Sequence, residues 1–90
     1  MKDLHEILDL MDEAIAKTDL FLSIDIGTSF VERTSFVVDF LSYKMEDDGQ
    51  IKRVFSECFY VRAHSTDTSE EYMRCRDYLK SLIAEGDRNA

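Results

Sequence analysis

The residues that could carry chemistry in this chain of 90 residues are few and scattered. The two histidines, His5 and His64, have no cysteine or carboxylate near them at the spacing of a metal site. Cys58 has Arg62 as its one basic neighbour on the same strand face, which does not make a reactive thiolate. Cys75 falls on the apolar stripe of a predicted helix, away from Cys58. We therefore expect no enzymatic activity, no metal and no other cofactor.

The stretch Ile24-Asp25-Ile26-Gly27-Thr28-Ser29 ends a predicted strand with small residues. It resembles the first phosphate-binding hairpin of the actin, hexokinase and heat-shock-protein-70 ATPase superfamily. The resemblance implies that Asp25 would act on a hydrated metal ion and that backbone N–H groups would approach the phosphates. That superfamily closes two large lobes on its nucleotide, and this chain supplies neither the lobes nor an adenosine pocket. We expect no ATP binding.

The composition is that of a small acidic domain. Its 11 basic and 19 acidic residues give a formal net charge of −8, which opposes contact with nucleic-acid phosphates. No apolar run approaches the roughly 20 residues that cross a bilayer, and the chain opens on an amphipathic pattern instead of a signal sequence. We expect a cytoplasmic protein with two reduced cysteines, binding neither nucleic acid nor a membrane.

Apolar spacing predicts a helix at each end of the chain and three strands between them. The first helix runs from about residue 3 to 17, with an apolar stripe of Leu4, Ile7, Leu8, Met11, Ala14 and Ile15. The second begins at a cap on Thr68, ends at a left-handed cap on Gly86, and carries Tyr72, Cys75, Leu79, Leu82 and Ile83. Leu20–Ile26 alternates as a strand. We expect one compact α+β domain over residues 1–90, frayed after about 86. Its order is α-β-β-β-α, with both helices packed on one face of a three-stranded antiparallel sheet.

The stretch from Thr34 to His64 is predicted to form a long β-hairpin with Asp48-Gly49 at its tip. A two-residue loop there pairs Ser42 with Phe55. It gives one strongly apolar face, made of Phe36, Val38, Phe40, Phe55, Phe59 and Val61. A three-residue loop is the rival, but it would create two pairs of like charge, Lys44–Lys52 and Asp39–Glu57. The two-residue loop has fewer such pairs and is preferred.

The opposite face of the hairpin keeps apolar and aromatic side chains that the two helices would not cover. We predict a protein-binding surface made of Val37, Leu41, Tyr43, Val54 and Tyr60, with Asp39 nearby. Long neighbouring side chains that cover this face are the alternative. An acidic surface is predicted at Asp9, Asp12, Glu13, Glu46, Asp47 and Asp48, with a purely solubilising role as its alternative.

Two functions from different classes are consistent with these features. The first is a non-enzymatic interaction module that binds a basic protein surface, as inhibitors or immunity-type factors of phages and mobile elements do. The second is a homodimeric structural or accessory subunit. It would associate through the open sheet face, or through the edge strands beside it, and its acidity would serve solubility. Binding driven by charge weakens steeply with ionic strength, whereas apolar pairing does not, so a salt titration separates the two. The identity of the protein partner does not follow from the sequence.

Overall fold

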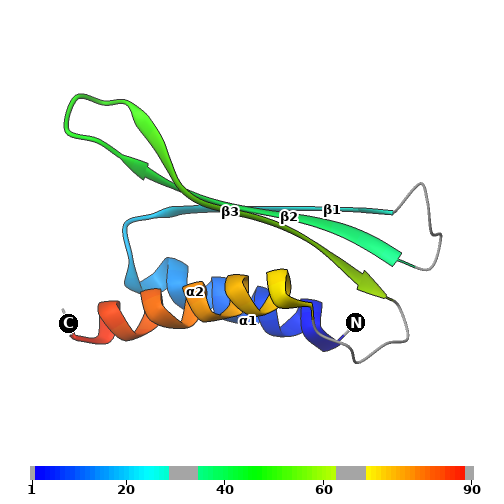
Figure 1. Ribbon diagram of the computed structural model, residues 1–90. Coiled ribbons are helices and arrows are strands. Elements are labelled where there is room, and N and C mark those ends of the chain that lie inside the picture. The colour runs from blue at the N-terminus through cyan, green and yellow to red at the C-terminus, as the bar shows by residue number, and fades with distance from the viewer. Residues whose placement is uncertain (1, 29–34, 63–68, 89–90) are drawn as a thin grey trace.

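The computed structural model describes residues 2–28, 35–62 and 69–88. In chain order they form α1 (Lys2–Lys17), β1 (Phe21–Thr28), β2 (Ser35–Met45), β3 (Ile51–Arg62) and α2 (Glu70–Arg88) (Figure 1). The three strands make one antiparallel sheet in the order β1-β2-β3, and both helices lie against the same face of it. The predicted α+β fold, its element order and the placement of the helices are confirmed.

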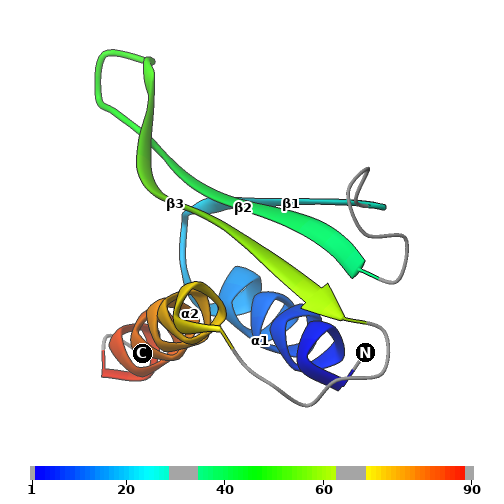
Figure 2. The ribbon, with the colours of Figure 1, turned by 45° about the vertical axis from the view of Figure 1, so that its right-hand side comes forward.

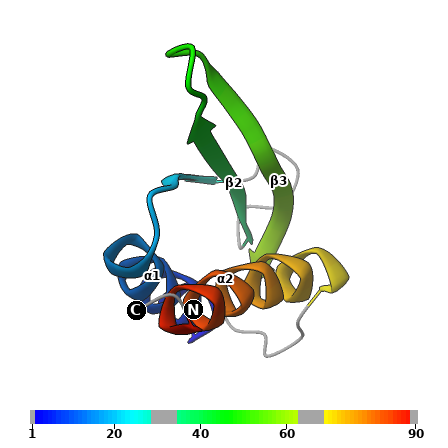
Figure 3. The same ribbon diagram turned by 90° about the vertical axis from the view of Figure 1, so that its left-hand side faces the viewer.

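The core lies between the sheet and the two helices, which run side by side beneath it (Figure 2). α1 lies under β1, and α2 lies under β3 (Figure 3). The predicted apolar face of the hairpin supplies the sheet's share of the core, since Val38, Phe40 and Phe59 are almost completely buried. The buried apolar residues are Leu4, Ile7, Met11, Ala14, Val38, Phe40, Phe59, Val61, Tyr72, Cys75, Leu79 and Leu82.

The two helices meet closely at their C-terminal ends. A Cβ atom on Gly86 would lie 2.6 Å from the carbonyl oxygen of Lys17, so this crossing requires a residue without a side chain. The Lys17 ammonium also pairs with Asp87 at 2.7 Å and with Glu13 at 3.0 Å. The predicted left-handed cap at Gly86 is wrong, because α2 continues to Arg88 and the role of this glycine is close packing. Residues 89–90 lie outside the described residues.

Two further boundaries differ from the sequence prediction. β1 continues through Gly27 to Thr28, so this glycine lies inside a strand and not in a turn. α2 begins at Glu70 and is capped by Ser69, whose hydroxyl oxygen accepts a hydrogen bond of 3.1 Å from the backbone N–H of Tyr72. The predicted cap, Thr68, lies outside the described residues.

The β2–β3 hairpin combines both of the registers considered from the sequence. Over residues 35–42 the pairing is that of the two-residue loop, with Ser42 opposite Phe55. Between Ser42 and the tip the pairing shifts by one residue, and Lys44 stands opposite Lys52 as the three-residue loop requires. The predicted apolar face is therefore correct, while the predicted tip is wrong.

The turn chemistry explains this change of register. Gly49 has a φ of 86°, and its N–H donates a 3.0 Å hydrogen bond to the carbonyl of Glu46. This is the geometry of a type I turn followed by a left-handed glycine, which needs three loop residues. Val54 is then the extra residue of a β-bulge. The bulge returns residues 55–62 of β3 to the register that buries the apolar side chains.

Two members of the predicted α1 stripe do not reach the core. Leu8 and Ile15 are 40% and 55% exposed. They lie on the flank of α1 turned away from Lys17, the residue that contacts α2. Periodicity placed them on the apolar side of the helix, but that side is wider than the surface that α2 and the sheet cover.

Candidate functional site on the open face of the sheet

The face of the sheet turned away from the helices, called the open face below, is built from alternate residues of all three strands. Residues i and i+2 of a strand point to the same side, so the strand register sets which residues meet. Four rows cross the open face: Gly27–Val37–Tyr60, Asp25–Asp39–Cys58, Ser23–Leu41–Ser56 and Phe21–Tyr43–Arg53. β1 thus contributes a third strand to a surface that was predicted from the hairpin alone.

The second row places two carboxylates side by side. Asp25 and Asp39 stand directly opposite one another on neighbouring antiparallel strands, and both are exposed. Like charges in this arrangement destabilise a sheet. Across the described residues, no lysine or arginine forms an ion pair with either carboxylate. The pair therefore lowers the stability of the sheet locally, and no ion pair of the described residues compensates for it.

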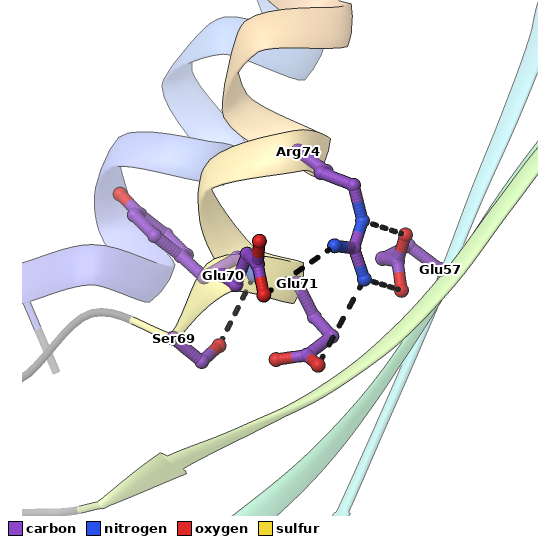
Figure 4. A network of polar contacts seen from close by, with 6 residues as sticks. Glu57, Ser69, Glu70, Glu71 and Arg74 are labelled. Carbon is purple, nitrogen blue, oxygen red and sulfur yellow. Dashed lines mark hydrogen bonds and ion pairs between the residues drawn. The ribbon is translucent and has the colours of Figure 1, made fainter.

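Several acidic side chains elsewhere in the protein have basic partners. Arg74 of α2 forms two hydrogen bonds with the Glu57 carboxylate of β3, at 3.0 and 3.3 Å, and it also faces Glu70 and Glu71 (Figure 4). The hydrogen bonds that the Arg74 guanidinium donates to Glu57 are the main cause that raises its pKa. Lys17 makes a comparable bridge between α1 and α2. The contrast sets the Asp25–Asp39 pair apart from these structural ion pairs.

Apolar and aromatic side chains border the carboxylate pair. Tyr60, which is 62% exposed, lies in the row next to the acidic row, and Phe21, which is 54% exposed, lies two rows away on the other side. A depression of about 510 Å³ crosses this part of the sheet and is lined by Asp25, Asp39, Phe40, Leu41, Arg53, Ser56, Glu57 and Cys58. A positively charged group that enters this depression would meet the carboxylates of Asp25 and Asp39, and it would have the guanidinium of Arg53 as a neighbour in the same lining.

Four of the five predicted interface residues lie together on this surface. Val37, Leu41 and Tyr43 are half-buried by their neighbours, and Tyr60 is exposed. Val54 stands apart from the four rows, because it is the extra residue of the bulge, and it is 43% exposed.

The residues of the predicted acidic surface do not form one patch. Asp9, Asp12 and Glu13 are exposed on α1, whereas Glu46, Asp47 and Asp48 lie at the hairpin tip, which rises away from the helices (Figure 3). One of the tip carboxylates has a local structural role, since Asp48 accepts a 2.9 Å hydrogen bond from the backbone N–H of Gln50. The two groups could not contact one small basic partner together.

The cysteines are free thiols in different surroundings. Cys58 is exposed at the end of the acidic row, where partial burial and then a hydrogen bond to Asp39 raise its pKa. Cys75 is buried in the core, and loss of solvent raises its pKa to about 12. Both thiols are thus held in the protonated form at neutral pH, which does not favour a nucleophile.

The described part of the chain holds neither a cluster of metal ligands nor a helix that could cross a membrane. Within residues 2–28, 35–62 and 69–88, no three histidine, cysteine or acidic side chains gather closely enough to bind a metal ion. Neither α1 nor α2 combines the length and the apolar character needed to cross a membrane. His64 lies outside the described residues, and His5 is exposed on α1.

Sequence reasoning missed Phe21 and Asp25 as members of the site. Alternation had placed both on one face of their strand, but the register between β1 and β2 depends on the connection over residues 29–34. That connection carries no recognisable turn signal. Without the register, Asp25 could not be set opposite Asp39.

Comparison with known proteins finds no matching family model, no matching curated protein and no matching solved structure. A functional proposal therefore depends on the geometry and charge of the open face.

Proposed function

We propose that the protein is a non-enzymatic interaction module whose open face binds an arginine-bearing surface of a partner protein. The observation that supports this is the Asp25–Asp39 pair, with which no lysine or arginine of the described residues forms an ion pair. A guanidinium between the two carboxylates would remove their repulsion and form charge-assisted hydrogen bonds with both. Binding would therefore recover a stabilisation that the free protein lacks.

The border of the site favours arginine over lysine. A guanidinium is planar, carries donors that suit two carboxylates, and stacks on aromatic rings, whereas an ammonium is a compact and strongly hydrated charge. Phe21 and Tyr60 offer exposed rings on the two sides of the acidic row. The apolar stem of the arginine would contact the ring of Tyr60, whose row is next to the acidic row.

The net charge of the chain supports the same partner chemistry. A charge of −8 on a small domain speeds encounter with a basic surface and repels acidic competitors. The acids of α1 and of the hairpin tip would contribute to this long-range field without direct contact. In this proposal these acids attract the partner toward the open face instead of binding it directly.

The alternative, a homodimer formed by stacking two open faces, meets an electrostatic obstacle. Such a dimer would bring two copies of the Asp25–Asp39 pair against each other in a poorly solvated interface. Like charges at an interface cost several kcal/mol. The acidic row thus favours a basic partner over a second open face.

A module of this kind acts by occupying the surface that it binds. If the partner uses a basic surface to contact nucleic acid or another anionic molecule, the open face would compete for it. That is the action of an inhibitor or immunity-type factor, the class of function expected from the sequence.

The proposal can be tested with a synthetic probe, without knowledge of the natural partner. A short peptide of alternating arginine and glycine would be titrated by calorimetry into the wild type and into Asp25→Asn with Asp39→Asn. The matched control is Asp9→Asn with Asp12→Asn, which changes the net charge equally, from −8 to −8 + 2 = −6, but on α1. A lysine–glycine peptide of the same length serves as the second probe.

We expect the open-face variant to weaken arginine-peptide binding by roughly tenfold or more and the α1 variant to change it by less than about threefold. The arginine peptide should also bind more tightly than the lysine peptide. Equal losses in both variants would show that only total charge matters, and the open face would then not be the binding site.

A further inference from the structure

The two edges of the sheet differ in how they are protected from pairing with another strand. β3 carries Lys52, Arg53 and Glu57, and charged side chains on an edge strand discourage association. β1 has the sequence Phe-Leu-Ser-Ile-Asp-Ile-Gly-Thr, with no lysine, arginine or proline and with Asp25 as its one charged residue. Among the described residues, only β2 pairs with β1, so its outer backbone groups face outward.

An uncovered apolar flank accompanies this unprotected edge. Leu8 and Ile15 of α1 are 40% and 55% exposed, and Ile26 on the helix-facing side of β1 is 44% exposed. α1 lies under β1 on one side of the domain (Figure 3), and all three residues belong to these two elements. Exposed aliphatic side chains beside an open strand edge indicate a surface that another chain covers.

We propose that β1 pairs antiparallel with β1 of a second copy of the chain, with Ile24 on the two-fold axis. This register follows from charge and from side-chain fit. It sets Ser23 opposite Asp25 of the second copy, so that a hydroxyl donor meets the carboxylate. A shift by two residues would instead set Asp25 opposite itself, which is unfavourable.

The same register provides a partner for a glycine that is otherwise unexplained. Gly27 lies inside β1, where glycine weakens a strand, and the space beside its Cα is empty, since a Cβ there would have no atom within 4 Å. Pairing about Ile24 places Phe21 of the second copy directly opposite Gly27. An aromatic ring beside a glycine on the neighbouring strand shields its exposed backbone and stabilises the pair. Phe21 is 54% exposed in the single chain, so it is free to do this.

The helix-facing side of the joined edge would be aliphatic. Leu22 pairs with Ile26 of the second copy in this register, and the symmetric contact repeats on the other side of the axis. Leu8 and Ile15 of the two α1 helices then face each other beneath the joined strands. Self-pairing is favoured over pairing with a foreign strand because β1 is complementary to itself in this register, with Phe21 opposite Gly27 and Leu22 opposite Ile26. The edge itself carries only the charge of Asp25.

The two-fold axis stands perpendicular to the sheet, so both open faces point to the same side of the joined sheet. This dimer leaves the Asp25–Asp39 pairs accessible, in contrast to a dimer of stacked open faces. It would present the proposed arginine sites as a double surface and raise the avidity for a partner with repeated arginines.

The test is the oligomeric state of the full chain and of three lysine variants by sedimentation, over about 1 to 500 μM. Ile26→Lys places a charge on the helix-facing side of β1, and Ile15→Lys places one on the exposed flank of α1. Ile51→Lys is the matched control, because Ile51 is 63% exposed on β3, away from this edge. Circular dichroism checks that each variant is folded. Hydrogen exchange of the β1 amides at low and high concentration reports the strand pairing itself.

We expect the wild type and Ile51→Lys to dimerise, and Ile26→Lys and Ile15→Lys each to raise the dissociation constant by at least about tenfold. Every second amide of β1 should gain protection as the concentration rises. A wild type that stays monomeric at about 500 μM would overturn the proposal. So would a dimer that neither lysine variant weakens, since its interface would lie elsewhere. If Ile26→Lys does not fold, the dissociation constant of Ile15→Lys, a substitution at an exposed position of α1, decides whether the interface lies at this edge.

Discussion

Replacement of Asp39 by asparagine should stabilise the protein, because it removes one charge from the cross-strand pair with Asp25. Side chains opposed in this way lie about 5 Å apart, at which two charges in water repel by about 0.8 kcal/mol. Physiological salt reduces this by roughly half. The Asp39 carboxylate accepts a stronger hydrogen bond from the Cys58 thiol than an asparagine amide would. Loss of this difference lowers the gain by roughly a few tenths of a kcal/mol, because the thiol is exposed. We expect a net gain of about 0.5 kcal/mol at low salt, or a rise in Tm of about 2–4 °C for a domain of this size.

The assay is thermal unfolding followed by circular dichroism at about 10 mM and about 1 M salt. Asp12→Asn is the control, because it changes the net charge equally, from −8 to −8 + 1 = −7, on the exposed face of α1. The Tm of Asp39→Asn should exceed that of Asp12→Asn at low salt, and the difference should shrink at high salt. If Asp39→Asn melts at or below Asp12→Asn at low salt, the two carboxylates do not repel in the folded state and the reasoning about the open face fails.

Three further outcomes follow from the packing and from the cysteines. Gly86→Ala should lower stability, because the added Cβ lies 2.6 Å from a carbonyl oxygen of α1; overpacking costs about 1–3 kcal/mol against a helix-propensity gain of about 1 kcal/mol. A stability equal to or above the wild type in urea would show that the helices separate freely there. Tyr78→Phe removes the 2.8 Å hydrogen bond to the buried Ser42 hydroxyl and should cost about 1–2 kcal/mol in the same assay; an unchanged midpoint would contradict it. In native protein a maleimide should modify Cys58 and spare Cys75, as read by mass spectrometry. Because the pKa of Cys58 is raised, its rate at pH 7 should fall below that of a free thiol and keep rising above pH 9, and a faster rate at pH 7 would argue against the influence of the neighbouring carboxylate.

The fold could be predicted because its strongest signals are local. Periodicity in α1 and α2, alternation in β1, and the apolar face led by Phe40 and Phe59 each follow from neighbouring residues, and together they leave one way to bury a core. The errors arose where tertiary contacts decide the outcome. Gly86 is a common sign of a helix end, but here a neighbouring helix backbone requires it. Like-charge pairs favour the two-residue loop, yet the turn geometry at Gly49 outweighs the single Lys44–Lys52 contact.

The candidate site was predicted only in part, for a related reason. The hairpin sets its own register, so Val37, Leu41, Tyr43 and Tyr60 were correctly placed on one surface. The register of β1 against β2 is set by contacts between residues far apart in the sequence, and no short sequence pattern encodes it. Asp25 and Phe21 could therefore join the site only once the strands were aligned.

The central claim is that the open face receives arginine, and NMR mapping of the arginine–glycine peptide on the wild type tests it most directly. The largest amide shifts should fall on Asp25, Asp39 and Leu41, with smaller changes along the exposed acids of α1. The same titration of the variant that carries Asp25→Asn and Asp39→Asn should leave the open-face amides nearly unmoved. Largest shifts on α1 around Asp12, or equal shifts in the variant, would contradict the claim.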